Sequence, residues 1–371
     1  MKRNKRTSGL SLLLFAILLA LSLSACGEAT PRRVSEYRTV MRFHEDFRIL
    51  QLTDLHFGIE TDLAEKTDLL RERIRREAPD LIILTGDNFM YASRETVVLL
   101  FQTLNEECRL LSEARPDRLT KFAVTFGNHD NQGTYDSYFV ARTLLGFAAP
   151  DGEERETGRY AAFVDFEGDA LYGNANYFID LVDDPARGGE ADVVYRLHII
   201  DSNSYHFLGF KYGYDVIHED QLAHIERIRR EATVDTDYIG RAFFHIPLSE
   251  FALAKEQYET APDPSLVGQG EWREKIHEPY TNNGAHFRMR EAGILGYFVG
   301  HDHVNYGEVL YREESGRLSV FSYGVKGTDQ LYHDGDMLGY KRIVLHGNMT
   351  EETFLTVENF GENFINVREG E

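Results

Sequence analysis

The first third of the chain alternates short apolar runs with longer amphipathic segments. Strand-like runs occupy 48–53, 81–86 and 121–126. Between them, apolar residues recur at helical spacing over 62–78 and 94–114. This strand–helix–strand–helix–strand order predicts parallel strands that are covered by helices.

Beyond residue 170 the pattern predicts mainly strands. One helix is expected over 219–232. Residues 251–290 are polar and predict a lid, or a loop with a short helix. Further strand patterns cover 176–182, 193–201, 240–246, 294–300, 317–324, 340–347 and 353–360.

The N-terminus has the pattern of an export signal. A basic start is followed by an apolar run and by the tetrapeptide Leu23-Ser24-Ala25-Cys26. We expect residues 1–25 to be a signal peptide that is absent from the mature chain. The tetrapeptide resembles a bacterial lipobox, in which Cys26 is lipidated and anchors the protein to a lipid bilayer. An ordinary secretory signal is the alternative. Residues 26–42 are expected to be a tether.

The charge of the chain excludes one class of partner. The chain has 40 basic and 61 acidic residues and a net charge of −21. The signal peptide holds four basic and no acidic residues, so its removal lowers the net charge by four to −25. Such a surface repels duplex DNA, and no nucleic-acid partner is expected.

Metal-binding side chains follow five of the predicted strands. In open α/β folds ligands gather at the carboxyl ends of strands, so these side chains are expected to converge. Any single histidine here could be a core residue. Metal-binding side chains at the ends of all five strands, however, indicate one site. The candidate ligands are Asp54, His56, Asp87, Asn128, His245, His301 and His303.

The candidate ligands suit a centre of two metal ions. Mixtures of carboxylate and imidazole bind Fe, Zn or Mn. Asp87 is the natural bridge, because one carboxylate offers two oxygens. Two metals roughly 3.5–4 Å apart can stabilise both the attacking and the leaving oxygen of a phosphoryl displacement. A phosphorylated small molecule is therefore the expected substrate.

The order of the motifs resembles that of the calcineurin-like metallophosphoesterase superfamily. The matching residues are Asp54-Leu55-His56, Gly86-Asp87-Asn88, Gly127-Asn128-His129-Asp130, His245 and Gly300-His301-Asp302-His303. The stretches "FFHIPLSEF" and "GHDHVN" are similar to a branch related to purple acid phosphatases. The resemblance implies an α/β fold over residues 43–360, with two mixed β-sheets packed face to face and flanked by helices (αββα).

The resemblance also implies a role for each matching residue. His129 would be the general acid for the leaving oxygen, Asp130 would orient it, and a hydroxide that bridges the metals would attack phosphorus. Purple enzymes have glycine in place of His56 and take a tyrosine ligand, and Tyr91 lies one residue past that tyrosine's position. His56 is therefore expected to be a ligand instead. The first metal would bind Asp54, His56, Asp87 and His303, and the second Asp87, Asn128, His245 and His301.

Four weaker candidates could contact substrate, although each can equally be an ordinary loop residue. These are Asn88, Asn131, Asn203 and Tyr205. We expect a lipid-anchored, extracytoplasmic phosphoesterase of a bacterial cell envelope, with a phosphomonoesterase as the first expectation. The alternatives are a phosphodiesterase or nucleotide hydrolase on the same site, and a ligand-binding surface lipoprotein that does not catalyse. The intact His129 argues against the last. No oligomeric state is predicted.

Overall fold

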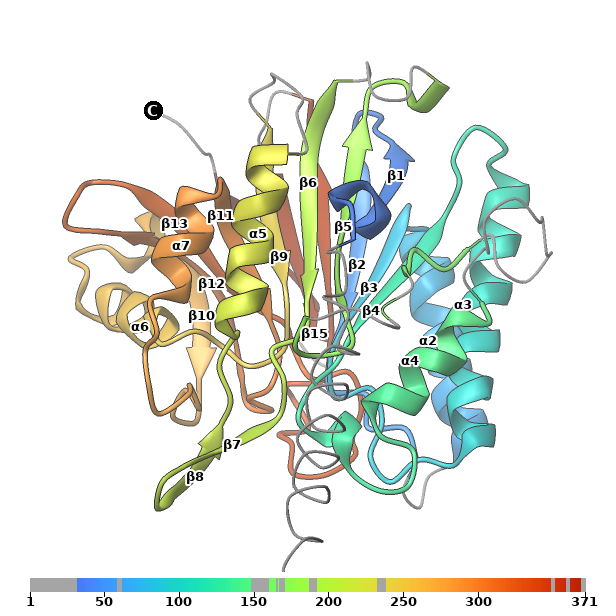
Figure 1. Cartoon of the computed structure of the whole chain (residues 1–371), viewed down its shortest axis with the longest axis horizontal. Helices are drawn as coiled ribbons and strands as arrows, with labels where there is room; N and C mark the ends of the chain where they lie inside the picture. The colour runs from blue at the N-terminus through green and yellow to red at the C-terminus, as the bar shows by residue number, and fades with distance from the viewer. Residues whose placement is uncertain are drawn as a thin grey trace, which may run out of the picture.

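Two mixed β-sheets pack face to face at the centre of the molecule, and helices cover their outer faces (Figure 1). The predicted αββα arrangement is therefore confirmed. The computed structural model describes residues 32–58, 62–147, 160–164, 166, 171–186, 192–231, 238–347, 351–357 and 361–367.

The six-stranded sheet contains the three predicted parallel strands. Its members are β2 (Phe47–Leu52), β3 (Leu81–Thr85), β4 (Lys121–Thr125), β14 (Gly339–Leu345), β15 (Glu351–Val357) and β16 (Gly361–Val367). The order is β16-β15-β14-β2-β3-β4. Strands β2, β3 and β4 run parallel, and the other neighbours are antiparallel.

The eight-stranded sheet is also mixed, in the order β1-β5-β6-β9-β11-β13-β12-β10. Its central strands β6, β9, β11 and β13 are parallel. Its members are β1 (Arg38–Arg42), β5 (Asn176–Val182), β6 (Val193–Ile200), β9 (Ile239–Phe243), β10 (Gly268–Trp272), β11 (Ile294–Val299), β12 (Asn305–Arg312) and β13 (Leu318–Tyr323).

Helices begin where the sequence offers capping side chains. Asp62 accepts hydrogen bonds from the first backbone N–H groups of one helix, and Ser93 caps the next. In Figure 1, α2, α3 and α4 lie beside the six-stranded sheet and α5, α6 and α7 beside the other. The bounds are α2 (Leu63–Glu77), α3 (Arg94–Ala114), α4 (Ser137–Leu145), α5 (Glu219–Glu231), α6 (Glu250–Thr260) and α7 (Ala285–Glu291), with short 3-10 turns at η1 (Val34–Tyr37), η2 (His129–Asn131) and η4 (Pro264–Leu266).

The largest hydrophobic cluster joins the two sheets. Ile83 and Val124 from the six-stranded sheet and Ile179 and Leu197 from the other are fully buried in it. Burial of this apolar area is the dominant stabilising term for such an arrangement. The sheets are therefore fixed against each other, and so are the loops at their ends.

Three sequence-based expectations need correction. The tether predicted over residues 26–42 is too long, because β1 pairs with β5 and Tyr37 is buried. The predicted domain end at 360 is too early, because β16 pairs with β15. The region 251–290 holds α6, β10 and α7 rather than a loop with one short helix.

The export-related predictions concern other parts of the chain. Residues 1–25 and Cys26 lie outside the described residues. Among the described residues, no helix combines the length and apolar character that crossing a membrane requires.

Candidate metal centre

The predicted ligands converge where the ends of the two sheets meet. Asp54, Asp87 and Asn128 follow β2, β3 and β4 of the six-stranded sheet, whereas His245 and His301 follow β9 and β11 of the eight-stranded sheet. Packing of one sheet on the other therefore assembles the site.

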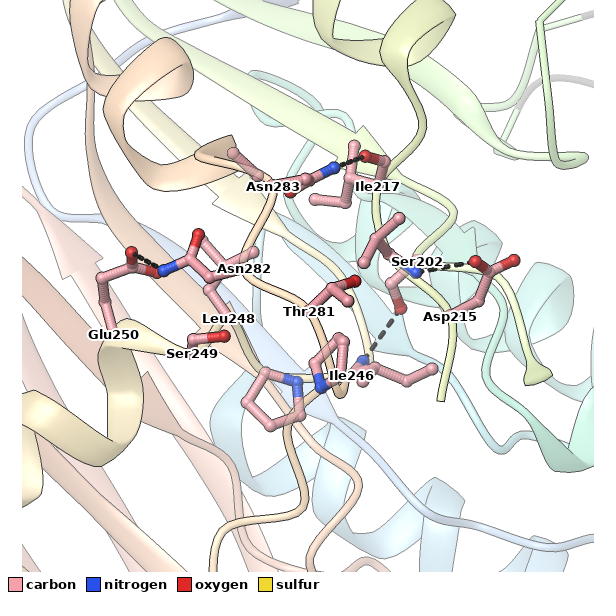
Figure 2. A pocket seen from close by; sticks show the side chains of 14 residues that line it. Ser202, Asp215, Ile217, Ile246, Leu248, Ser249, Glu250, Thr281, Asn282 and Asn283 are labelled. Atoms are coloured by element: carbon pink, nitrogen blue, oxygen red, sulfur yellow. Dashed lines mark hydrogen bonds between the residues drawn. The ribbon is translucent and has the colours of Figure 1, made fainter. Parts of the chain in front are cut away.

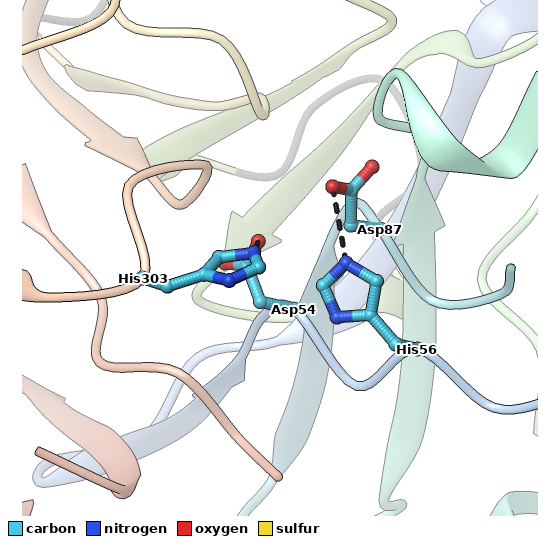
Figure 3. Close-up of side chains that lie close together, drawn as sticks. All are labelled: Asp54, His56, Asp87 and His303. Atoms are coloured by element: carbon cyan, nitrogen blue, oxygen red, sulfur yellow. Dashed lines mark ion pairs between the residues drawn. The ribbon is translucent and has the colours of Figure 1, made fainter. Parts of the chain in front are cut away.

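One group of ligand atoms is formed by four of these side chains. The ligand atoms of Asp54, His56, Asp87 and His303 all lie within 4.8 Å of one another (Figure 3). His56 Nε2 is 3.4 Å from Asp87 Oδ2, and His303 Nε2 is 3.5 Å from Asp54 Oδ1. This is the set predicted for the first metal.

A second group adjoins the first and shares Asp87 with it. The ligand atoms of Asp87, His245 and His301 also lie within 4.8 Å of one another. His245 Nε2 is 3.2 Å from Asp87 Oδ2 and 3.3 Å from His301 Nδ1. Asp87 therefore lies between the two groups, as a bridging ligand must.

Unpaired polar atoms show that these residues fit metal ions. Buried polar atoms normally have hydrogen-bond partners, so a cluster of atoms without them indicates that a ligand belongs there. Transition-metal ions such as Zn and Fe bind carboxylate oxygens and imidazole nitrogens of this kind. The buried atoms without a partner include Asp54 Oδ1, His56 Nε2, Asp87 Oδ2, Asn128 Oδ1 and His301 Nε2.

Backbone carbonyls hold the outer ring nitrogens of two other candidate ligands. His245 Nδ1 bonds the Thr85 carbonyl at 2.9 Å, and His303 Nδ1 bonds the Tyr332 carbonyl at 2.8 Å. Such outer contacts fix the ring orientation and the tautomer of a metal-binding histidine. In both rings Nε2 is left facing the carboxylates.

The loop that carries His245 is braced next to a small pocket (Figure 2). Ser202 Oγ accepts hydrogen bonds from the backbone N–H groups of His245 and Ile246, at 3.1 and 2.8 Å. This contact ties the end of β9 to the end of β6 and so positions His245.

Backbone strain is concentrated at the ligands. Asp54, His56, Asp87 and His301 have φ values of 54°, 46°, 49° and 87°, in the left-handed region that non-glycine residues rarely adopt. Strain of this kind persists only where the surrounding structure imposes it, typically at functional sites. Gly127 also packs closely here, since a Cβ atom on it would overlap Asp87 and His245.

The electrostatics of the site prepare it for cations. Burial alone would raise the pKa of Asp54 and Asp87, but the adjacent histidines hold both well below the usual range. Burial lowers the pKa of His56 and of His301 to about 4. The carboxylates are therefore anionic and these two imidazoles neutral, which are the forms that bind metals. Burial lowers the pKa of His245, but Asp87 raises it to about 9, so His245 has to lose a proton when it binds a metal.

Comparison with known proteins agrees with this geometry. A sequence profile described as Calcineurin-like phosphoesterase matches residues 47–305, which is more than half of the chain. The chain belongs to this family. Members of the family normally bind two metal ions.

Relatives of this phosphoesterase occur in plants and yeast. "Probable inactive purple acid phosphatase 29" of Arabidopsis thaliana is 27% identical over 330 residues, covering 81% of this chain and 78% of that protein. "Probable inactive purple acid phosphatase 14" of the same plant is 25% identical, covering 82% and 77%. "Phosphatase DCR2" of Saccharomyces cerevisiae is 25% identical, covering 70% of this chain and 44% of that protein.

His129 lies at the rim of the phosphoesterase site and outside both ligand groups. Its Nε2 is 3.9 Å from Asp87 Oδ2, and its side chain is 21% exposed. Its backbone N–H donates to Asp87 Oδ1 at 2.8 Å. The ring is therefore next to the centre and partly exposed to solvent.

The role predicted for Asp130 is wrong. Its carboxylate accepts hydrogen bonds from the backbone N–H groups of Phe89 and Gly127, each at 2.8 Å, and from Asn88 Nδ2 at 3.2 Å. Burial, and then the charge of Asp87, raise the pKa of Asp130 to about 8. Asp130 therefore joins the loops after β3 and β4 and does not orient His129.

Three of the four candidate substrate contacts make hydrogen bonds within or between loops. Asn88 is buried and donates to the Thr125 carbonyl, and Asn203 is buried and donates to the Val216 carbonyl. Asn131 Oδ1 accepts a hydrogen bond from Ser137 Oγ at 2.7 Å. These contacts hold loops, and the substrate roles of the three residues stay predictions.

Tyr205 does reach the site, and so do Lys326, from the segment 322–329 that the sequence places near the pocket, and Tyr214, which was not among the candidates. Asn128 Nδ2 donates to the Tyr205 hydroxyl at 3.0 Å. Lys326 Nζ lies 3.0 Å from His56 Nδ1, and the Tyr214 ring packs edge-on against His301. Tyr214 could have been noticed because aromatic residues alternate along the segment from Tyr205. By contrast Tyr91, which purple enzymes suggest as a ligand position, is exposed.

Proposed function

We propose that this phosphoesterase is a metal-dependent phosphomonoesterase with His129 as its general acid. The observation that carries the proposal is the pair of adjacent ligand groups that share Asp87 and contain buried atoms without partners. The metals, when bound, supply positive charge that polarises the phosphoryl group and acidifies water.

Residues of the chain determine how much of that charge remains and how the ligands are oriented. Asp54 and Asp87 offset only part of the charge of two cations, so an anionic phosphate is still attracted. Asn128, in the loop before His129, presents an unpaired amide oxygen to the same centre. Its amide nitrogen is held by Tyr205, which fixes the orientation of that oxygen.

His129 supplies the proton for the leaving oxygen. The hydrogen bond from its backbone to Asp87 places the ring beside the centre, and the ring can exchange protons with solvent because it is partly exposed. Protonation of a poor leaving group by such a residue typically contributes about 10²–10⁴-fold to the rate.

A second candidate function is binding of phosphate esters without turnover. The names of the two plant relatives, which contain the words "probable inactive", favour it. The experiment that separates the two removes metals with a chelator and restores Zn²⁺, Mn²⁺ or Fe²⁺. Phosphate release is then measured from a panel of monoesters and diesters. Turnover of monoesters with metal and none without it supports the proposal, and binding without turnover supports the alternative.

We also propose that the protein is exported and anchored to a membrane by lipid on Cys26. The support is the sequence Leu23-Ser24-Ala25-Cys26 after an apolar run. Radiolabelled palmitate should be incorporated into the expressed wild-type protein and not into Cys26→Ser. Equal labelling of the two proteins would contradict the anchor.

A further inference from the structure

A two-stranded arm projects from the fold (Figure 1), and residues at its base contact the metal centre. It consists of β7 (Tyr205–Leu208) and β8 (Lys211–Tyr214), which pair with each other and with neither large sheet. An isolated hairpin is marginally stable, so contacts at its base and faces must hold it.

The two faces of the arm differ in chemistry. Tyr205 pairs with Tyr214 and Phe207 with Tyr212, and directly opposite residues share a face of the hairpin. The rings of Tyr205 and Tyr212 stack at 5.0 Å between centroids, and those of Tyr205 and Tyr214 at 5.4 Å. One face is therefore a continuous row of four aromatic residues.

The opposite face contacts another part of the chain at Gly213. The Tyr280 ring lies directly against Gly213, where an added Cβ atom would overlap it. Lys211 Nζ lies 5.8 Å from the centroid of the same ring. Tyr280 therefore supports the arm from behind and leaves the aromatic face free of that contact.

The base of the aromatic face belongs to the metal centre. The Tyr205 hydroxyl bonds Asn128, and the Tyr214 ring lies 4.3 Å from the His301 ring, centroid to centroid, at an angle of 88°. Further out, Phe207 and Tyr212 are 63% and 61% exposed. The row of rings therefore runs from two candidate metal ligands out to solvent.

We infer that the aromatic face of β7–β8 binds a flat aromatic group in the alcohol part of the phosphate ester. This inference rests on the proposed function, because it places the phosphate at the metals. The substrate class is then aryl-bearing or nucleobase-bearing phosphate monoesters. Phe207 and Tyr212 are the specificity-determining residues, and Tyr205 and Tyr214 join them to the centre.

The physical basis is stacking on a preformed surface. Stacking of a base on an aromatic side chain tolerates different ring systems and contributes about five- to hundredfold to binding. Two-thirds-exposed aromatic residues are otherwise an unfavourable surface, and a group of them commonly marks a binding site. Phosphate at the metals and a ring on the arm would be held by one continuous wall.

The first test measures binding, so that it does not depend on turnover. Phenylphosphonate and methylphosphonate share the phosphonate group and differ in the ring. Calorimetry on metal-reconstituted protein should show that the phenyl compound binds about five- to hundredfold more tightly. Tyr212→Ala and Phe207→Ala should each reduce the ratio of the affinity for phenylphosphonate to that for methylphosphonate. The double variant should bring this ratio near one. Lys211→Ala, on the opposite face of the arm, is the matched control and should keep the wild-type ratio.

The second test distinguishes nucleobase-bearing esters from other aryl-bearing esters. The ratio of kcat/KM is measured for adenosine 5′-monophosphate over ribose 5-phosphate, and for 2-phenylethyl phosphate over ethyl phosphate. Each pair has similar alcohol leaving groups, so the ratio reports recognition of the ring. A kcat/KM ratio above one in only the first pair shows that the arm recognises nucleobases. A ratio above one in both pairs shows that it recognises aromatic rings in general.

The outcomes distinguish this inference from the proposed function. Equal affinities for the two phosphonates in the wild type overturn the inference, even if esters are hydrolysed. A preference for phenylphosphonate without hydrolysis of any ester overturns the proposed function and leaves the inference standing. If Phe207→Ala and Tyr212→Ala keep the ratio but abolish co-sedimentation with phosphatidylcholine vesicles, the arm is a membrane contact and the inference is wrong.

Discussion

The backbone N–H of His129 donates to the Oδ1 atom of Asp87 at 2.8 Å. Oδ2 of the same carboxylate faces both ligand groups. The residue shared by the two metal groups therefore also sets the position of the proposed proton donor. Binding and proton transfer are joined by one side chain.

Replacement of His129 should affect proton transfer and not metal binding. We expect His129→Ala to lower kcat on alkyl phosphates by about 10²–10⁴-fold, with a smaller loss on aryl phosphates, whose leaving oxygen needs no proton. Kinetics across a leaving-group series and elemental analysis provide the measurement. Loss of metal from the variant would show instead that His129 is a ligand.

Asp130→Ala should destabilise the fold. Removal of the carboxylate leaves the buried N–H groups of Phe89 and Gly127 without partners, so the free energy of unfolding should fall by about 3 kcal/mol in urea titrations. The remaining folded enzyme should keep the leaving-group dependence of the wild type. If that dependence became the one seen for His129→Ala, Asp130 would after all orient the ring.

Gly127→Ala should disrupt the metal centre through shape alone. The new Cβ atom would overlap Asp87 and would lie 2.6 Å from His245 Cγ, so the shared ligand has to move. Metal content after dialysis should fall below that of the wild type. Gly335→Ala is the control, because a Cβ atom there meets nothing within 4 Å. Equal metal content in all three proteins would refute the close-packing argument.

Stability should fall in acid because of two buried histidines away from the metals. Burial holds the pKa of His198 well below its usual range and lowers that of His224 to about 3. The unfolded chain takes up these protons below about pH 6.5, whereas the folded protein does not. The free energy of unfolding therefore keeps the full contribution of these histidines above that pH. Below it, the free energy of unfolding falls by about 1.4 kcal/mol per pH unit for each histidine.

Urea unfolding between pH 7.5 and 5 tests this dependence. In His198→Leu and His224→Leu the free energy of unfolding should fall less steeply with decreasing pH than in the wild type. The difference in each variant should correspond to the uptake of about one proton fewer on unfolding. Comparison with the wild type cancels the contribution of the metal ligands. An unchanged slope in both leucine variants would be incompatible with neutral buried rings.

The hydrogen bonds that Asp130 accepts show what could not be predicted from the sequence. A carboxylate next to His129 could orient that ring or bind a backbone group, and the local sequence is the same in both cases. Its partner Phe89 lies 41 positions earlier in the chain. Strand β1 was missed for a similar reason, since its partner β5 lies far along the chain and most of its residues are not buried.

The sequence by itself determined the parallel strands, the motifs that end them and the family resemblance, because hydrophobic period and residue type are local properties of the chain. It also determined that Asp54, His56, Asp87 and His301 carry metal-binding groups. Only the tertiary structure decided that these groups face one another from two sheets. It alone placed the aromatic face of β7–β8 beside them, because side-chain direction and proximity depend on how distant segments pack.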